Sequence, residues 1–155
     1  MLDSIDAKIL NILQTNAKIT NLDLADRINL SPTACLNRVK KLEKSGVISG
    51  YKAEIDPTKA GYSICGLVLI RISNNTKEAA ADFTKAILKS PSIIECNMTA
   101  GKIDYVAKVF AKDFQHYEAI VRDELSALPH IVSMETLFLF SNLVPNAIFD
   151  FEGQS

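Results

Sequence analysis

Residues 20–48 read TNLDLADRINLSPTACLNRVKKLEKSGVI, and this stretch predicts two short amphipathic helices separated by a tight turn. The first helix follows a cap at Thr20 or Asn21, because short polar side chains accept hydrogen bonds from exposed backbone N–H groups at a helix start. Its inward side chains are Leu24, Ala25 and Ile28. Residues 29–30 form the connector.

The second helix begins at Ser31–Pro32 and runs to about Ser45. Ser31 is the N-cap, and Pro32 occupies the first helical position, where its missing N–H costs nothing. Gly46 supplies the left-handed residue after the helix. We expect an apolar stripe of Cys35, Leu36, Val39 and Leu42, and an opposite face of Ala34, Asn37, Arg38 and Lys41.

Two short helices around a tight turn are typical of a helix-turn-helix, which places its second helix in the major groove of DNA. Asn and Arg suit base edges, whereas Lys and Ser reach phosphates. The predicted DNA-binding residues are Ser31, Thr33, Ala34, Asn37, Arg38 and Lys41. The alternative interpretation is a solvated helix face without a ligand.

Composition predicts a globular chain. Of 155 residues, 48% are apolar and 23% charged, a balance that excludes a disordered protein. No apolar run reaches the roughly 20 residues of a membrane helix, and residues 1–8 lack the apolar core of a signal peptide. We therefore expect a cytoplasmic protein. Its three cysteines include no C-x-x-C pair, which favours reduced, buried thiols over disulfides or zinc.

The net charge of −1 is unusual for a DNA-binding chain. Residues 1–60 hold nine Lys and Arg against seven Asp and Glu, which gives +2, and the remainder holds eight against eleven, which gives −3. Non-specific DNA affinity comes from phosphate neutralisation. A single copy at +2 would bind weakly, so either DNA is not the target or several copies act together.

The helical pair is flanked by further elements. Residues 3–15 predict a helix capped at Asp3 or Ser4, and Val47–Ile55 predicts a short strand or wing. Asp56–Pro57 marks a turn. We expect a winged helix-turn-helix domain over residues 1–49, a linker strand over 50–62 and a second domain over 63–155.

The second domain alternates strand and helix patterns. The predicted elements are strands at 63–73, 93–99, 103–111 and 131–140 and helices at 76–88 and 113–128. Their order is βαββαβ, the ferredoxin-like arrangement. The expected fold class is therefore α+β.

The strand at 63–73 is apolar on both faces, through Leu67, Val68, Leu69 and Ile70. An antiparallel sheet covered on one side should instead alternate apolar and polar residues. Two helices can cover only one sheet face. We therefore expect the other face to meet a second copy of the chain, which gives a homodimer.

The chain resembles the Lrp/AsnC family, the leucine-responsive or feast/famine transcription regulators. The resemblance covers nearly the whole chain and lies in Leu2-Asp3, Asp6, Leu30-Ser31-Pro32-Thr33, Arg38-Val39, Leu42-Glu43, Gly46-Val47-Ile48, Gly50-Tyr51, Asp56-Pro57, Glu95-Cys96, Gly101, Asp104-Tyr105, Lys108 and Leu128-Pro129. It implies a winged helix-turn-helix for double-stranded DNA, a linker strand, and a ferredoxin-like (RAM-type) domain that binds an amino acid. It also implies dimers that assemble further, to an octamer.

The resemblance places the effector near the turn at 101–105, at contacts between dimers. Asp104 could accept hydrogen bonds from the ligand's ammonium group, and the backbone N–H groups of 100–102 could bind its carboxylate. The alternative is that Asp104 bonds its own backbone as a turn residue. The residues carried over are Met98, Gly101, Lys102, Asp104, Tyr105, Met134 and Thr136. An apolar Met134 beside Met98 suggests leucine or methionine as effector.

The sequence offers no catalytic set, nucleotide-binding loop, cofactor motif or metal site. His116 and His130 are too isolated to indicate a metal site. We therefore expect a DNA-binding regulator and not an enzyme. The alternatives are an amino-acid sensor whose helical domain binds protein, and a small ferredoxin-like enzyme.

Overall fold

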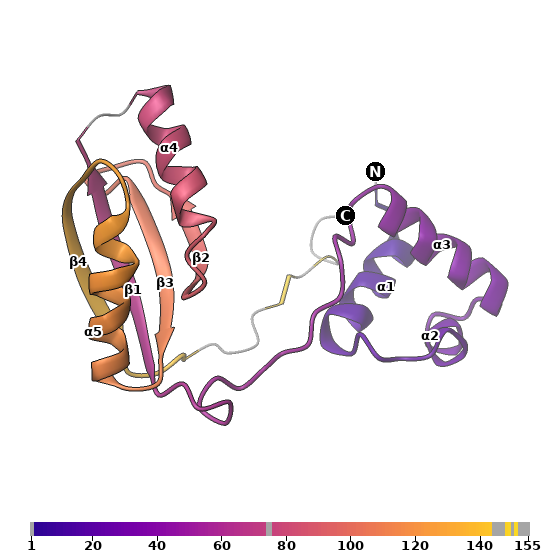
Figure 1. Ribbon diagram of the computed structural model, residues 1–155. Coiled ribbons are helices and arrows are strands. Elements are labelled where there is room, and N and C mark those ends of the chain that lie inside the picture. The colour runs from indigo at the N-terminus through magenta and orange to yellow at the C-terminus, as the bar shows by residue number, and fades with distance from the viewer. Residues whose placement is uncertain (1, 74–75, 144–147, 150, 152–155) are drawn as a thin grey trace. The chain divides into compact units, whose positions relative to one another are not determined.

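The computed structural model describes residues 2–73, 76–143, 148, 149 and 151. The chain divides into two compact units (Figure 1). The first comprises the residues up to Glu54 together with the C-terminal segment, and the second comprises Ile55–Leu143. Within the described residues, no helix is both long and apolar enough to cross a membrane.

The first unit is built from α1 (Ser4–Thr15), α2 (Asn21–Arg27) and α3 (Pro32–Lys44). Each helix begins after a side chain that accepts backbone N–H groups, as the sequence predicts: Asp3, Thr20 and Ser31. The apolar faces of the helices meet in a core of Ile9, Leu10, Leu24, Ala25, Ile28, Cys35 and Leu42.

The turn between α2 and α3 is fixed by local hydrogen bonds. Asn29 adopts the left-handed conformation at φ 54°, which asparagine tolerates better than most residues. The N–H of Leu30 donates to Ala25 O at 2.9 Å, the bond expected where a helix ends on a left-handed residue. Asn21 Nδ2 donates to Pro32 O at 2.8 Å and so ties the starts of the two helices together.

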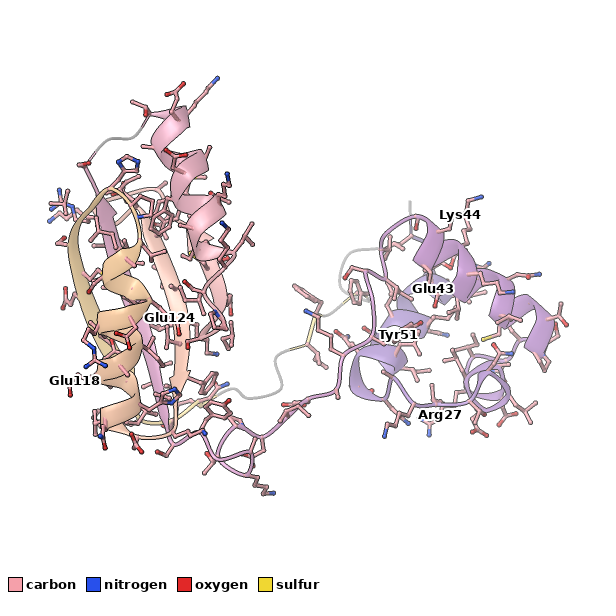
Figure 2. All side chains as sticks on the ribbon, viewed as in Figure 1. Arg27, Glu43, Lys44, Tyr51, Glu118 and Glu124 are labelled. Carbon is pink, nitrogen blue, oxygen red and sulfur yellow. The ribbon has the colours of Figure 1, made fainter. Side chains whose placement is uncertain are left out.

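Of the two alternatives predicted for Val47–Ile55, a short strand or a wing, the strand is wrong, and so is the linker strand predicted over residues 50–62, because residues 47–62 contain neither strand nor helix. A strand needs a hydrogen-bonded neighbour, and the described part of the first unit offers none. The segment is held instead by the hydroxyl of Tyr51, which donates to Glu43 Oε1 at 2.9 Å (Figure 2). The predicted turn at Asp56–Pro57 is confirmed, with Asp56 Oδ1 accepting from Thr58 N at 3.0 Å.

The second unit has the predicted βαββαβ order, with all strand pairs antiparallel. The sheet order is β2-β3-β1-β4, so β1 and β3 are central. Its elements are β1 (Ile64–Ile72), α4 (Lys77–Ile87), β2 (Ile93–Met98), β3 (Tyr105–Ala111), α5 (Phe114–Asp123), the short 3-10 helix η1 (Leu125–Ala127) and β4 (Ile131–Leu139).

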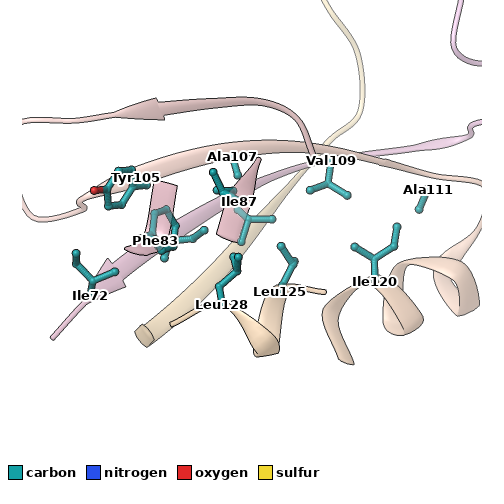
Figure 3. Packing of buried hydrophobic residues seen from close by; sticks show 12 residues of the cluster. Ile72, Phe83, Ile87, Tyr105, Ala107, Val109, Ala111, Ile120, Leu125 and Leu128 are labelled. Atoms are coloured by element: carbon teal, nitrogen blue, oxygen red, sulfur yellow. The ribbon is translucent and has the colours of Figure 1, made fainter. Parts of the chain in front are cut away.

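The core of this unit lies between the sheet and the helices (Figure 3). Phe83 from α4 is fully buried and stacks on Tyr105 of β3, with ring centroids 4.3 Å apart. Ile120 from α5 and Leu125 from η1 close the other end of the same core. Both helices therefore cover one face of the sheet.

The opposite face of the sheet is not part of this core; it carries apolar side chains on β1 and β4, with Lys108 and Glu135 as register partners of two of them. Leu67 of β1 is half-buried, and its neighbour in register on β4, Leu137, is 45% exposed. The next neighbours along these strands are Cys65 and Leu139. We call Cys65, Leu67, Leu69, Leu137 and Leu139 the open sheet face.

The C-terminal segment contacts the first unit. The side-chain amide of Gln14 on α1 both donates to Phe149 O at 2.7 Å and accepts from Phe149 N at 2.9 Å. Phe151 packs against the core of the same unit.

Candidate nucleic-acid interface and ligand site

The exposed face of α3 carries the three lysines of this helix. After Pro32, its exposed residues recur at spacings of three and four, which places them on one side: Thr33, Leu36, Asn37, Lys40, Lys41, Glu43 and Lys44. Lys44 projects from α3 away from α1 and α2 (Figure 2). This surface carries three lysines against one carboxylate, Glu43, which accepts a hydrogen bond from the Tyr51 hydroxyl, and its excess of positive charge suits the negative charge of DNA.

This face is rotated relative to the predicted one. Ser31, Thr33, Asn37 and Lys41 are exposed, whereas Ala34 and Arg38 are half-buried. The prediction that Leu36 belongs to the apolar stripe is wrong, since its side chain is 40% exposed and stands among the polar residues. The core of three helices is narrow, and Cys35 and Leu42 with the half-buried Val39 fill the contact that α3 makes with it.

Arg38 is held by two carboxylates at the start of α1. Its Nη1 lies 2.7 Å from Asp3 Oδ2 and 2.8 Å from Asp6 Oδ1. Asp3 and Asp6 also cap α1 reciprocally, each side chain accepting the other's backbone N–H. The Arg38 side chain is 32% exposed, so this ion pair is partly shielded from water.

The pKa of Asp3 lies below its ordinary value of 3.8, first because its carboxylate accepts the N–H of Asp6 and next because it accepts a hydrogen bond from Arg38. The hydrogen bonds that the Arg38 guanidinium donates to Asp3 and to Asp6 raise the pKa of Arg38. Both groups are therefore charged at neutral pH. We call the contact of Arg38 with Asp3 and Asp6 the α1–α3 ion pair.

Lys40 and Lys44 are exposed residues that the sequence interpretation missed. The available signal was the spacing of Thr33, Asn37, Lys40 and Lys44, at intervals of four, three and four. Ala34, Arg38 and Lys41 have an equally regular spacing, and this second pattern predicts a different exposed face. Periodicity alone could not decide between two polar faces that overlap on one helix.

The predicted ligand residues of the second unit lie in three places. The first is the turn between β2 and β3, where Gly101 and Lys102 are exposed. Gly101 has φ 157°, a conformation that other residues rarely adopt. Asp104 closes this turn: its Oδ2 accepts from Ile72 N at 2.9 Å, and its own N–H donates to Ile70 O at 3.0 Å. Its carboxylate therefore bonds the end of β1, not its own turn.

The second place is a pocket of about 370 Å³ between α4 and β2. Met98 and Tyr105 line it, together with Ile87, Ile94 and Cys96 among others. Tyr105 is buried, and burial raises the pKa of its phenol. Burial likewise raises the pKa of the Cys96 thiol. Both side chains are therefore neutral at physiological pH, and Glu95 is the one acidic residue of a lining that is otherwise mainly apolar.

The third place is β4, at the opposite edge of the sheet. Met134 packs against the core, and the Thr136 hydroxyl hydrogen-bonds the Tyr117 hydroxyl. Met98, Tyr105, Ile70 and Met134 form one cross-strand row. The idea that Met134 stands beside Met98 is therefore wrong, because three strand spacings, about 14 Å, separate them.

A helix-turn-helix unit followed by a ferredoxin-like unit defines a class of DNA-binding regulators with a ligand-binding domain. Residues 2–49 match the family model of a winged helix-turn-helix DNA-binding domain, and residues 65–148 match that of the Lrp/AsnC ligand-binding domain. The chain belongs to the Lrp/AsnC family of transcription regulators.

Its relatives include the leucine-responsive regulatory protein of Haemophilus influenzae, 39% identical over 87% of this chain and 81% of the relative. The transcriptional regulator AzlB of Bacillus subtilis is 38% identical over 91% of this chain and 90% of its own. Among solved structures, a transcriptional regulator from Neisseria meningitidis in complex with L-Met has a TM-score of 0.86 at 30% identity, covering 92% of both chains.

Proposed function

We propose that this chain is a homo-oligomeric, non-enzymatic transcription regulator that reads double-stranded DNA with the exposed face of α3 and responds to a small amino acid bound by its second unit. The observation that carries the proposal is the position of the lysines of α3, which share one exposed face directly after a rigid turn. We assign residues 1–49 to DNA binding, 50–62 to the linker and 63–155 to effector binding and assembly.

For DNA, the proposed contacts are Thr33 and Asn37 to bases and Ser31, Lys40, Lys41 and Lys44 to phosphates. The N-terminal residues of a recognition helix contact base edges, which favours the first two for that role. We propose no DNA contact for Arg38 or Ala34. Arg38 bonds Asp3 and Asp6 and so positions α3 against α1, and Ala34 is half-buried.

For the effector, we propose an apolar amino acid, leucine or methionine, bound at the turn around Gly101 with Lys102 and Asp104. The remaining residues of the set, Met98, Tyr105, Met134 and Thr136, would belong to the same site only if copies of the chain meet there. Two relatives support the apolar effector: one is named leucine-responsive, and another was solved with L-Met.

For assembly, we propose a dimer through the open sheet face and a higher oligomer, an octamer by family resemblance, in the cytoplasm. The exposed Leu137 and Leu139 support the dimer, because contiguous exposed apolar side chains mark interaction sites. A dimer also doubles the phosphate contacts of a helical unit whose net charge is small.

The test combines two titrations of the full chain. Duplexes selected from a random pool are titrated by fluorescence anisotropy, and each common amino acid is titrated by calorimetry. We expect specific DNA binding and binding of leucine or methionine. Absence of duplex binding would refute the proposed DNA-binding function and would favour an amino-acid sensor whose helical domain binds protein. Binding of polar or basic amino acids alone would refute the apolar effector.

A further inference from the structure

Leu36 is an apolar side chain on the exposed face of α3, at the edge of this face where Glu43 follows seven residues later. It follows Thr33 by three residues and precedes Lys40 by four, with Asn37 beside it. The described side chains packed on the core of the first unit do not include Leu36. Its exposure of 40% is therefore not explained by the packing of this unit.

The position of Leu36 along α3 indicates that its partner is the edge of a base. This inference rests on the proposed function in DNA binding. Leu36 lies in the N-terminal half of the helix, which contacts base edges when a recognition helix enters the major groove. Lys40, Lys41 and Lys44 follow toward the C-terminal end, where their charge complements phosphates. Three lysines against the single carboxylate of Glu43 leave this half of the helix positive, which favours DNA over an apolar protein surface as the occupant of the face.

Leucine has no hydrogen-bond donor or acceptor in its side chain. The major-groove edges of the base pairs present polar groups, except for the C5 methyl group of thymine. A leucine against any other base edge would remove water from a polar group without replacing its hydrogen bond, which is unfavourable. Against a thymine methyl, both surfaces are apolar and both leave water together.

We propose that Leu36 is a specificity-determining residue that reads thymine, through contact of its Cδ methyl groups with the C5 methyl group. Each half-site of the operator then carries a required thymine at the position facing Leu36. Thr33, one turn earlier, contacts the neighbouring step of the same groove.

The test replaces thymines one at a time by deoxyuridine in a duplex selected by the full chain. This substitution removes the methyl group and keeps every hydrogen-bonding group. Wild-type protein should lose about fourfold in affinity at one thymine per half-site, the effect of one apolar carbon group left unburied. Leu36→Ala should bind more weakly to the thymine duplex and should show no further loss with deoxyuridine at that position.

Leu22→Ala is the matched control, because Leu22 is an exposed leucine of the same unit on α2, with 66% of its surface accessible. It should keep the wild-type sensitivity to deoxyuridine. If no thymine is sensitive in the wild-type complex, or if Leu36→Ala keeps the same sensitive thymine, the inference is overturned while DNA binding stands.

A change in the oligomer mass of Leu36→Ala with unchanged deoxyuridine sensitivity would assign Leu36 to a protein contact, and would also overturn the inference. Failure of the wild-type chain to select any duplex would instead refute the proposed function itself. The two failures are therefore distinguishable.

Discussion

Arg38 is a residue type that suits DNA, but in this structure its guanidinium binds two carboxylates of the same chain. Its guanidinium bonds Asp3 and Asp6, which themselves cap α1, so one side chain joins the start of the first helix to the middle of the third. Asp6 is only 7% exposed, and a buried carboxylate without its partner is unfavourable. The α1–α3 ion pair therefore sets the orientation of the exposed face of α3.

We predict that Arg38→Ala lowers the thermal unfolding temperature of the first unit, because it leaves the Asp6 carboxylate without its cation. Circular dichroism of the full chain measures this change. Arg27→Ala is the control, since Arg27 is an exposed arginine of α2 and should shift the unfolding temperature less. Reduced DNA affinity with an unchanged unfolding temperature would show that Arg38 contacts DNA instead.

The α1–α3 ion pair should also depend on pH. The pKa of Asp3 is lowered in the folded state, so its contribution to stability is complete above the ordinary value of 3.8 and is lost as pH falls through the lowered pKa. We expect the difference in unfolding temperature between wild type and Arg38→Ala to be large at about pH 7 and to shrink at about pH 3. A difference that stays constant over this range would contradict the assignment.

At the scale of elements, α3 should bind phosphates through Lys40 and Lys44. We predict that the double variant Lys40→Gln/Lys44→Gln weakens DNA binding uniformly across sequences. The slope of the logarithm of affinity against that of salt should fall by about 0.9 for each phosphate contact removed. Lys8→Gln is the matched control, because Lys8 is an exposed lysine on α1. An unchanged slope in the double variant would exclude these lysines from the interface.

The packing of α4 on the sheet depends on Phe83. We predict that Phe83→Ala destabilises the second unit by about 3–5 kcal/mol, the cost of removing a buried aromatic side chain and leaving a cavity. Denaturant unfolding monitored by tyrosine fluorescence measures it. Phe114→Ala on α5 is the control, since Phe114 is largely exposed and should cost much less. Equal effects of the two variants would contradict the position assigned to α4.

The elements were predictable where the determining chemistry is local. Asp3, Thr20 and Ser31 cap the helices that the sequence predicts after them, because a cap bonds the first turn that follows it. The βαββαβ order likewise follows from alternating apolar periods and short turns. The rotation of α3 was not predictable, since it depends on how three helices share one core.

Contacts between residues far apart in the sequence could not be predicted from local sequence patterns either. The Arg38–Asp3 contact spans 35 residues, and each partner has an ordinary local explanation as a helix-face or capping residue. Met98 and Met134 enter one expected site through the family resemblance, which does not say how far apart the two residues lie within one sheet. Their separation follows from the sheet order, which puts β2 and β4 on opposite edges.

At the scale of the whole molecule, the small net charge of the helical unit and the exposed leucines of the open sheet face have a common explanation. A helical unit of small net charge gains affinity when several copies bind one duplex, and the open sheet face offers the surface that joins them. Leu67 and Leu137 are neighbours in register near its centre. A charge at Leu137 should therefore prevent assembly without disturbing the core, which lies on the opposite side of the sheet.

The most direct test compares wild type with Leu137→Lys by native mass spectrometry and by anisotropy with the selected duplex, at one salt concentration. We predict that wild type is a dimer or larger, and that Leu137→Lys is a folded monomer that binds the duplex at least about tenfold more weakly, as expected when linked contacts are lost. A monomeric wild type, or a monomeric variant with wild-type DNA affinity, would contradict the account.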